Sequence, residues 1–507
     1  MPDAALVGLD IGTFETKGVV TTLDGAVLAQ TAVGHEVSHP QPGWAEHDAD
    51  DVWWGDVKRV LEVLLRKLPR SHRVAAVAVS GLGPCVLPVG ADLAPLRPAI
   101  LYGIDTRAEA EIDELEQRLG TDEIRSRSGN ALSSQSAGPK IAWVARHEPD
   151  VAAATASYLT SQSYVVARLT GALVVDHLTA GYFHPFYRLS SQGWDLEGVE
   201  DLVRPDQLPR IGWAGEIAGL VSAVAAAETG LPEGVPVAVG TSDAPAEALA
   251  AGVRRPGHVM AMYGSSGFFI APTAQPQPHH ALYTAPGLTP GTWLQAAGTS
   301  NAGSVTRWAL SLEGRDNTPE AFVGLAASAL ESPPGARGLL FLPHLVGERT
   351  PVDDPASRGA MVGLGMEHGR SDLARALLEG VAHAMAWAVR TLTGESPVSG
   401  ITAIGGGTRN PVWLQAVSDI SGLPQAVVHS PGACLGSAYL AGCAAGLTSW
   451  ATEWAPEISH TVHPRPGLRE LYTHEHTRFQ AVYHSLTDTR RRAPVPSPST
   501  ATPRTTS

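Results

Sequence analysis

Three glycine-rich stretches, far apart along the chain, constrain what this sequence can fold into. They are ALVGLDIGTFETKG at 5–18, VMAMYGSSGFF at 259–269 and ITAIGGGTRNPVW at 401–413. Each follows or ends an apolar run of the kind that forms a strand. A glycine turn at such a place lets backbone N–H groups face an anion with no side chain in the way. Together the turns predict one anionic ligand, a nucleoside triphosphate, held between two halves of the protein.

Length and charge narrow the class of protein. At 507 residues, with 44% apolar and 17% charged residues, the chain is expected to form a globular enzyme of two to four domains. The net charge of −14 argues against a nucleic-acid or anionic-membrane surface, which needs a basic stripe. A small anionic ligand remains possible, because amides, a lysine and a metal ion can bind it.

The cysteines and the apolar runs indicate the cellular compartment in which the protein is expected. Cys85, Cys434 and Cys443 form no CxxC or Cys/His ligand pattern, which indicates a reducing compartment and three core-filling side chains. No apolar run reaches the roughly 18 residues of a membrane span, and no basic segment precedes the first apolar run. We therefore expect a cytoplasmic protein.

Strand and helix patterns alternate, which predicts a layered α/β fold. The pattern predicts a hairpin over 5–30, a helix over 50–68, strands over 74–79 and 235–240, and a helix from about Pro245. Near Gly257 the opening series restarts, so we place a domain boundary near residue 250. The expected parts are an N-terminal domain at 1–250, a C-terminal domain at 251–485 and a disordered tail at 486–507, which is rich in Pro, Ser and Thr. A helix over 371–392 is expected to have Ser371 as its cap.

Two aspartates stand where chemistry is expected. Asp10 ends an apolar run, where a carboxylate needs a cation such as Mg²⁺ or hydrogen-bond donors. Asp243 lies at a strand-to-helix junction and could accept the proton of a sugar hydroxyl as that oxygen attacks the γ-phosphorus. The alternatives are structural: Asp10 could tie down a turn, and Asp243 could cap a helix. Glu247 is expected to be solvated.

The remaining candidates face the phosphates. Gly12, Thr13, Thr16 and Lys17 offer hydroxyls and a positive charge to a triphosphate, and Gly264, Ser265 and Ser266 offer further amides and hydroxyls. An ordinary turn is the alternative for this GSSG segment. Three consecutive glycines at 405–407, followed by Asn410, fit close approach of the backbone to a nucleotide. Neither GxxxxGK[ST] nor a Rossmann GxGxxG is present.

Over roughly residues 5–485 the sequence resembles the FGGY family of carbohydrate kinases, most closely its xylulokinase-like members. The segments that carry the resemblance are GLDIGT, PGWAEHDADDVWW, LRPAILYGIDTR, SYVVARLTG, GTSDAPAEALAAGV, MYGSSG, NAGSVTRW, FLPHLVGERTPVDDPASRGAMVGL, ARALLEGVAHAM and GGGTRNPVWLQAVSDISGLP. It implies two ribonuclease-H-like, actin-type domains with ATP and sugar in the cleft between them, which closes by a hinge.

The resemblance also implies roles. Asp243 matches the family's general base and Asp10 its magnesium-linked aspartate. The positions expected to contact phosphates or the rest of the nucleotide are Thr13, Thr16, Lys17, Ser265, Gly303, Arg307, Gly406 and Asn410.

The sugar side departs from the family pattern. Where xylulokinases usually read SGQMHG, this chain has SGLGPC at 80–85, which places Gly83 and Pro84 against the substrate. A WNDGR segment becomes Tyr102-Gly103-Ile104-Asp105-Thr106-Arg107, in which Asp105 and Arg107 are expected hydroxyl ligands. A site without side-chain donors discriminates hydroxyl patterns less well.

The leading hypothesis is an ATP- and Mg²⁺-dependent kinase that phosphorylates a primary hydroxyl of a ketopentose such as xylulose. Another ketose, a deoxy sugar or a polyol is an alternative substrate. A non-catalytic sugar sensor and an actin-like ATPase that acts on proteins are alternatives from other classes. The expected partners are the sugar and ATP, with no nucleic acid or membrane, and a homodimer is possible.

Overall fold

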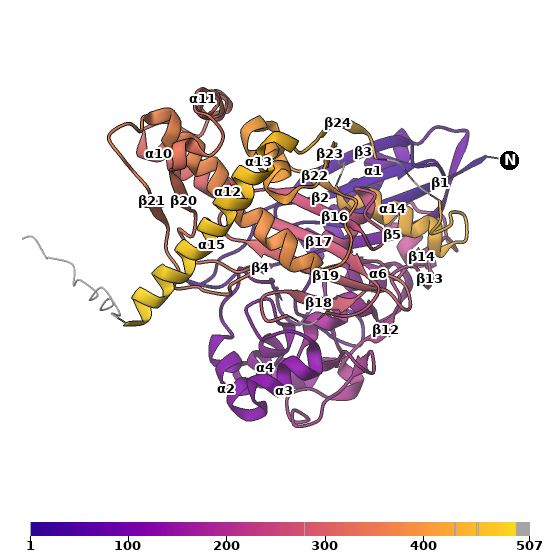
Figure 1. The fold of residues 1–507 in the computed structure, drawn as a ribbon. Coiled ribbons are helices and arrows are strands. Elements are labelled where there is room, and N and C mark those ends of the chain that lie inside the picture. Colours follow the sequence, from indigo (N-terminus) through magenta and orange to yellow (C-terminus); the bar gives the residue numbers. More distant parts are fainter. Residues whose placement is uncertain (1, 278, 430–431, 453, 455, 493–507) are drawn as a thin grey trace, which may run out of the picture.

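The computed structural model describes residues 2–277, 279–429, 432–452, 454 and 456–492, which form two mixed seven-stranded sheets (Figure 1). The first sheet has the order β13-β14-β5-β1-β2-β3, with β15 beside β5. Its strands are β1 (Asp3–Ile11), β2 (Glu15–Thr21), β3 (Val27–Gly34), β5 (His72–Gly81), β13 (Ile217–Leu220), β14 (Pro236–Ala238) and β15 (Thr241–Ser242).

The second sheet repeats the topology of the first. Its order is β18-β19-β17-β16-β22-β23-β24. Its strands are β16 (His258–Tyr263), β17 (Gly267–Thr273), β18 (Tyr283–Pro286), β19 (Trp293–Thr299), β22 (Gly400–Ile404), β23 (Gln425–Val428) and β24 (Ile458–Val462). In both sheets an antiparallel meander of three strands is continued by two parallel strands. This confirms the predicted duplicated α/β fold.

Two helices fill the space between the sheets. They are α9 (Asp243–Ala250) and α14 (Ala433–Ala444), which pack on each other, while α14 also packs on β1 and β5. Side chains alternate along β1, so Leu6 contributes to this central layer while Val7 and Leu9 join the core on the other face. Gly8 is needed because an added Cβ would lie 1.9 Å from the carbonyl oxygen of Cys434.

The helix expected over 50–68 is present, but its first turn differs. A wide π-helical turn, η1 (Ala49–Trp54), precedes α1 (Gly55–Lys67). Asp48 caps this turn by accepting from the backbone N–H groups of Asp50 and Asp51. Val57, Val60, Leu61 and Leu64 are buried against the first sheet.

Between β5 and β13 the chain builds a lobe of short elements, of which α2, α3 and α4 gather at the bottom of Figure 1. With β4 (Glu46–His47), these are β6 (Leu87–Val89), β7 (Ala99–Ile100), α2 (Glu109–Leu119), α3 (Thr121–Ser128), α4 (Ala137–His147), α5 (Pro149–Ala154), β8 (Ser157–Leu159), α6 (Ser161–Thr170), β9 (Val174–Asp176), α7 (His177–Ala180), η2 (Gly181–Phe183), β10 (Tyr187–Arg188), β11 (Gly193–Trp194), η3 (Pro205–Gln207) and β12 (Arg210–Gly212); α8 (Ala223–Thr229) follows β13.

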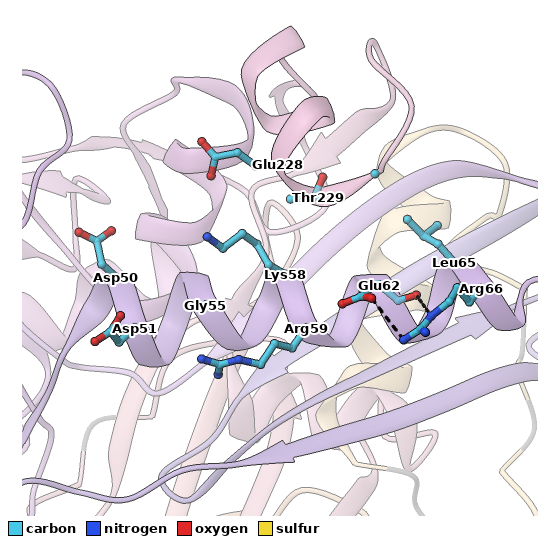
Figure 2. Close-up of a pocket in the computed structure, with 11 residues that line it drawn as sticks. Asp50, Asp51, Gly55, Lys58, Arg59, Glu62, Leu65, Arg66, Glu228 and Thr229 are labelled. Carbon is cyan, nitrogen blue, oxygen red and sulfur yellow. Dashed lines mark hydrogen bonds and ion pairs between the residues drawn. The ribbon is translucent and has the colours of Figure 1, made fainter.

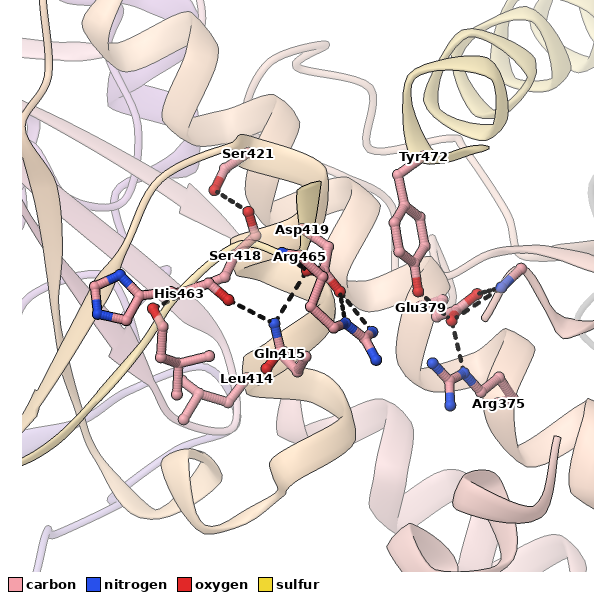
Figure 3. Close-up of polar contacts among 12 residues, drawn as sticks. Arg375, Glu379, Leu414, Gln415, Ser418, Asp419, Ser421, His463, Arg465 and Tyr472 are labelled. Carbon is pink, nitrogen blue, oxygen red and sulfur yellow. Dashed lines mark hydrogen bonds and ion pairs between the residues drawn. The ribbon is translucent and has the colours of Figure 1, made fainter. Parts of the chain in front are cut away.

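Two outer helices of the second half, α12 (Arg370–Thr393) and α15 (Arg469–Arg492), are joined by a buried hydrogen bond. Glu379 of α12 accepts from Arg375 at 2.7 Å and from the Tyr472 hydroxyl at 2.6 Å, which ties α15 to α12 (Figure 3). The other elements are α10 (Gly303–Leu312), α11 (Pro319–Glu331), η4 (Ala336–Gly338), β20 (Leu340–Leu342), β21 (Ala360–Val362), η5 (Gly406–Arg409), α13 (Pro411–Ser421) and η6 (Pro466–Leu468). None of the helices described is long and apolar enough to cross a bilayer.

Two local expectations were wrong. Ser371 does not cap α12: the helix begins at Arg370, Asp372 accepts from the Gly369 N–H at 2.9 Å, and the Ser371 hydroxyl bonds Glu331 instead. The expected tail starts too early, because α15 extends to Arg492; the rest of that tail, 493–507, lies outside the described residues.

Candidate active site

Asp10 lies in a row of polar residues across the first sheet. It pairs with Lys17 of β2 on one side and with Ser80 of β5 on the other, and Thr241 follows beyond Ser80. Its carboxylate, in a residue only 8% exposed, accepts from the Ser80 hydroxyl at 2.8 Å. Burial raises the pKa of Asp10 above its ordinary value, against the lowering effects of Ser80 and Lys17.

Asp243 is the first residue of α9, one position beyond the helix cap Ser242. Its carboxylate accepts from the Ala244 N–H at 2.8 Å. Burial and then the negative charge of Asp10 raise the pKa of Asp243 to about 7. The two aspartates are therefore close enough for their charges to act on each other.

Glu247, one turn further along α9, is not solvated as expected. It is half-buried, and burial followed by the charge of Asp10 raises its pKa to about 7, while Lys17 opposes the shift. Three carboxyl groups thus share a partly buried site in which Lys17 is a nearby cation. Such a site favours a bound cation. Within the described residues no group of three or more His, Cys, Asp or Glu side chains could hold a metal ion by itself, so a cation here would need further oxygen ligands.

The first glycine turn joins β1 to β2. The N–H groups of Thr13 and Phe14 donate no hydrogen bond to any acceptor in the described part of the chain. The Thr13 hydroxyl lies 2.9 Å from that of Tyr102, and Lys17 Nζ lies 2.9 Å from Glu15. Thr16 points to the opposite face from Lys17 and is fully buried.

In the second turn, Gly264 to Gly267, both Ser265 and Ser266 are exposed to solvent. The N–H groups of Ser265 and Ser266 bond no acceptor among the residues described. Gly303 begins α10 and supports this turn by donating its N–H to the Gly264 carbonyl at 2.9 Å. A Cβ at 303 would lie 2.6 Å from that oxygen, which explains the glycine.

The third turn packs against the second. Gly405 has φ +93°, and its Cβ would lie 2.9 Å from the Tyr263 carbonyl oxygen, whereas a Cβ at Gly406 would meet nothing within 4 Å. Gly406 therefore faces open space. Asn410 caps α13 by accepting from the Val412 and Trp413 N–H groups. Arg307 is exposed on α10.

On the sugar side, Gly83 lies directly against the residue before Asp243, because its Cβ would be 2.9 Å from that of Ser242. Pro84 follows in a cis peptide. The side chains of Asp105 and Arg107 are both fully buried and form an ion pair at 2.7 Å. Asp105 also accepts from the Ala45 N–H, and Arg107 stacks over Trp44 at 3.9 Å. These contacts fix the 102–107 loop, and a sugar contact by either residue stays a prediction.

Sequence reasoning missed two tyrosines near Asp243. Burial raises the pKa of both Tyr102 and Tyr182, and the charge of Asp243 raises each further. Tyr182 stacks on Tyr283 of the second sheet at 4.2 Å. Tyr102 stands where the family has tryptophan, a signal that was available, whereas Tyr182 has no motif around it.

A hollow of about 710 Å³ lies apart from these residues, beside α1 and the end of α8 (Figure 2). It is lined by acidic and basic side chains, including the Glu62–Arg66 pair. No predicted site residue reaches it.

Comparison with known proteins identifies the class. Models of the FGGY family of carbohydrate kinases match the chain, the N-terminal domain over residues 5–250 and the C-terminal domain over 259–445. The chain belongs to this family and is a carbohydrate kinase.

Its relatives narrow the comparison. It is 31% identical over 490 residues to xylulose kinase of Escherichia coli (strain K12), covering 95% of this chain and 99% of the relative. It is 27% identical to gluconokinase of Bacillus subtilis (strain 168), with 86% of each chain covered. The crystal structure of xylulose kinase from Rhodospirillum rubrum matches with a TM-score of 0.90 and 33% identity, over 96% of this chain and 100% of that one.

Proposed function

We propose that the enzyme transfers the γ-phosphoryl group of ATP to a primary hydroxyl of a ketopentose, with xylulose as the foremost candidate. The observation that carries the mechanism is the pair of interacting carboxylates, buried Asp10 and half-buried Asp243, beside glycine turns in which the N–H groups of Thr13, Ser265 and Ser266 are unpaired within the described residues. The near full-length similarity to xylulose kinases supports the substrate. The use of ATP, and three cysteines that form no disulfide among the described residues, fit the predicted cytoplasmic location.

Mg²⁺ fits the site at Asp10. The carboxylate of Asp10 is buried, its pKa is raised, and one hydroxyl donates to it, so a bound cation would stabilise its ionised form. Lys17 is its partner on the neighbouring strand β2. Because a single aspartate suffices only when phosphate oxygens and water complete the coordination, the absence of a larger ligand cluster in the described chain agrees with Mg²⁺–ATP. When bound, Mg²⁺ would neutralise charge on the transferring phosphoryl group.

The protein's own contribution is a base and a set of donors. Asp243 accepts the proton of the attacking hydroxyl, and at the start of α9 it lies close enough to Asp10 for the charge of Asp10 to raise its pKa. In this proposal the N–H groups of Thr13, Ser265 and Gly406 donate to phosphate oxygens.

The pH profile tests the base. Because Asp243 must be ionised to accept a proton and has a pKa of about 7, kcat/KM should rise about tenfold per pH unit below 7 and level off above it. The measurement is kcat/KM for the sugar from about pH 5.5 to about 8.5, at low concentrations of both substrates, so that it reports the free enzyme. A flat profile over this range would contradict the assignment.

A substrate panel tests the sugar. Xylulose, ribulose, other ketoses, deoxy sugars, gluconate and polyols are incubated with Mg²⁺–ATP, and the phosphorylated product is identified by mass. We expect xylulose to give the highest kcat/KM. If another compound gives a higher kcat/KM, that compound replaces xylulose as the proposed substrate, and the assignment of the protein as a carbohydrate kinase still stands. Sugar binding without product from any member would favour the non-catalytic sensor.

A further inference from the structure

Two buried histidines lie behind the first glycine turn. His35 follows β3, and its backbone N–H donates to the Phe14 carbonyl at 2.9 Å. Its ring spans two acceptors, with Nε2 3.0 Å from the Gly12 carbonyl oxygen and Nδ1 2.8 Å from the Asp56 carboxylate. The side chains of His35 and Asp56 are only 6% and 1% exposed, so water cannot replace these bonds freely.

The neighbours of His35 and Asp56 define how the ring is held. Asp56 also accepts a hydrogen bond from Arg59, so its carboxylate lies between Arg59 and the His35 ring. Because a backbone carbonyl only accepts, the contact with Gly12 is made by the Nε2–H of His35. The other titratable group packed on the ring is His47, 4.9 Å away edge-on.

His47 keeps a defined tautomer. Trp53 donates its Nε1–H to His47 Nδ1 at 3.0 Å, so the proton of His47 is on Nε2, on the side of the Thr13 carbonyl. Among the described residues, His47 Nε2 has no hydrogen-bond partner. Burial lowers the pKa of His47 to about 4, so this ring is neutral.

These contacts orient the turn. In a planar trans peptide the C=O of one residue and the N–H of the next point in opposite directions. Holding the Gly12 carbonyl at His35 therefore turns the Thr13 N–H away from the histidine, where it stays unpaired within the described chain.

We propose that His35 is a positioning residue for the nucleotide. It fixes the Gly12–Thr13 peptide from behind, so that the Thr13 N–H is presented to a phosphate oxygen before ATP arrives. This inference rests on the proposed function, in which the first turn receives the phosphates of ATP.

Two substitutions at the same position separate positioning from packing. In His35→Gln the longer amide side chain can still place an N–H near the Gly12 carbonyl, whereas in His35→Asn the shorter one reaches only toward Asp56. We expect His35→Asn to raise the Kd for ADP and the KM for ATP by about tenfold, the size of effect expected from losing one well-placed bond. His35→Gln should stay within about threefold of wild type, and the KM for the sugar should change little in either.

The controls keep the outcomes distinct. His39→Ala removes an exposed histidine of the same segment and should leave all constants unchanged. Equal nucleotide constants for the Asn and Gln variants, or wild-type affinity in His35→Asn, would overturn the proposal. If His35→Asn does not fold, Asp56→Ala provides a second test. It removes the carboxylate that holds the His35 ring and keeps the histidine itself, and it should weaken ADP binding. Failure of wild-type protein to bind ADP would instead contradict the proposed function.

Discussion

Replacing Asp243 with asparagine is expected to lower kcat by about 10²- to 10⁴-fold, the range for loss of a general base. Asparagine keeps the shape of the side chain and can accept the Ala244 N–H, so α9 should form normally. ADP affinity should change by no more than a few-fold, because the nucleotide turns are not touched. The measurement is steady-state kinetics with the preferred sugar, together with calorimetric binding of ADP.

Glu247→Gln is the matched control for this variant. Glu247 lies one turn away on the same helix, also has a raised pKa and faces the charge of Asp10. Removing its charge relieves repulsion without removing the base, so turnover should fall far less than in Asp243→Asn. Full turnover in Asp243→Asn, or equal losses in both variants, would show that Asp243 is not the base.

Gly436→Val should damage both stability and catalysis through the contact between α14 and α9. A Cβ at 436 would lie 1.8 Å from the carbonyl oxygen of Ala246, backbone that has no way to move without shifting α9. Overpacking of this kind costs about 1–3 kcal/mol or more, which corresponds to a fall of about 2–6 °C in the thermal midpoint. Because α9 begins at Asp243, a shift of about 1 Å can also cost about 10²-fold in kcat.

A glycine in open space provides the comparison. A Cβ at Gly467 would meet nothing within 4 Å, so Gly467→Ala should leave the midpoint and kcat nearly unchanged. Thermal unfolding and the kcat of the folded protein are measured for both variants. Wild-type values in Gly436→Val would mean that the two helices are not held as closely as the structure shows.

Much of the fold could be predicted because the deciding signals are local. Apolar runs that end in Asp10 or in glycine turns mark strands and their ends, and the restart near Gly257 marks the second half. The same signals brought Asp10 and Asp243 forward as candidates, and the structure places both at one site.

The rest depends on contacts that no local pattern contains. From the sequence of its own helix, Glu247 is expected to be solvated. In the structure it is partly buried and lies near the charge of Asp10, which belongs to β1. His35 stands in an unremarkable segment, and its role comes from Gly12 and Asp56, 23 and 21 residues away. Ser371 has the residue type of a cap, yet Asp372 makes the capping bond because the helix starts one residue earlier.

The position of α14 has a consequence for how the protein is made. This helix is translated after residue 432, yet it covers β1 and β5, which are among the earliest strands to leave the ribosome. Leu6, Ala76 and Ala78 on that face must therefore wait, uncovered and prone to wrong associations, until nearly the whole chain has emerged. The first half of the enzyme therefore completes its core only after α14, in the last third of the chain, has been synthesised.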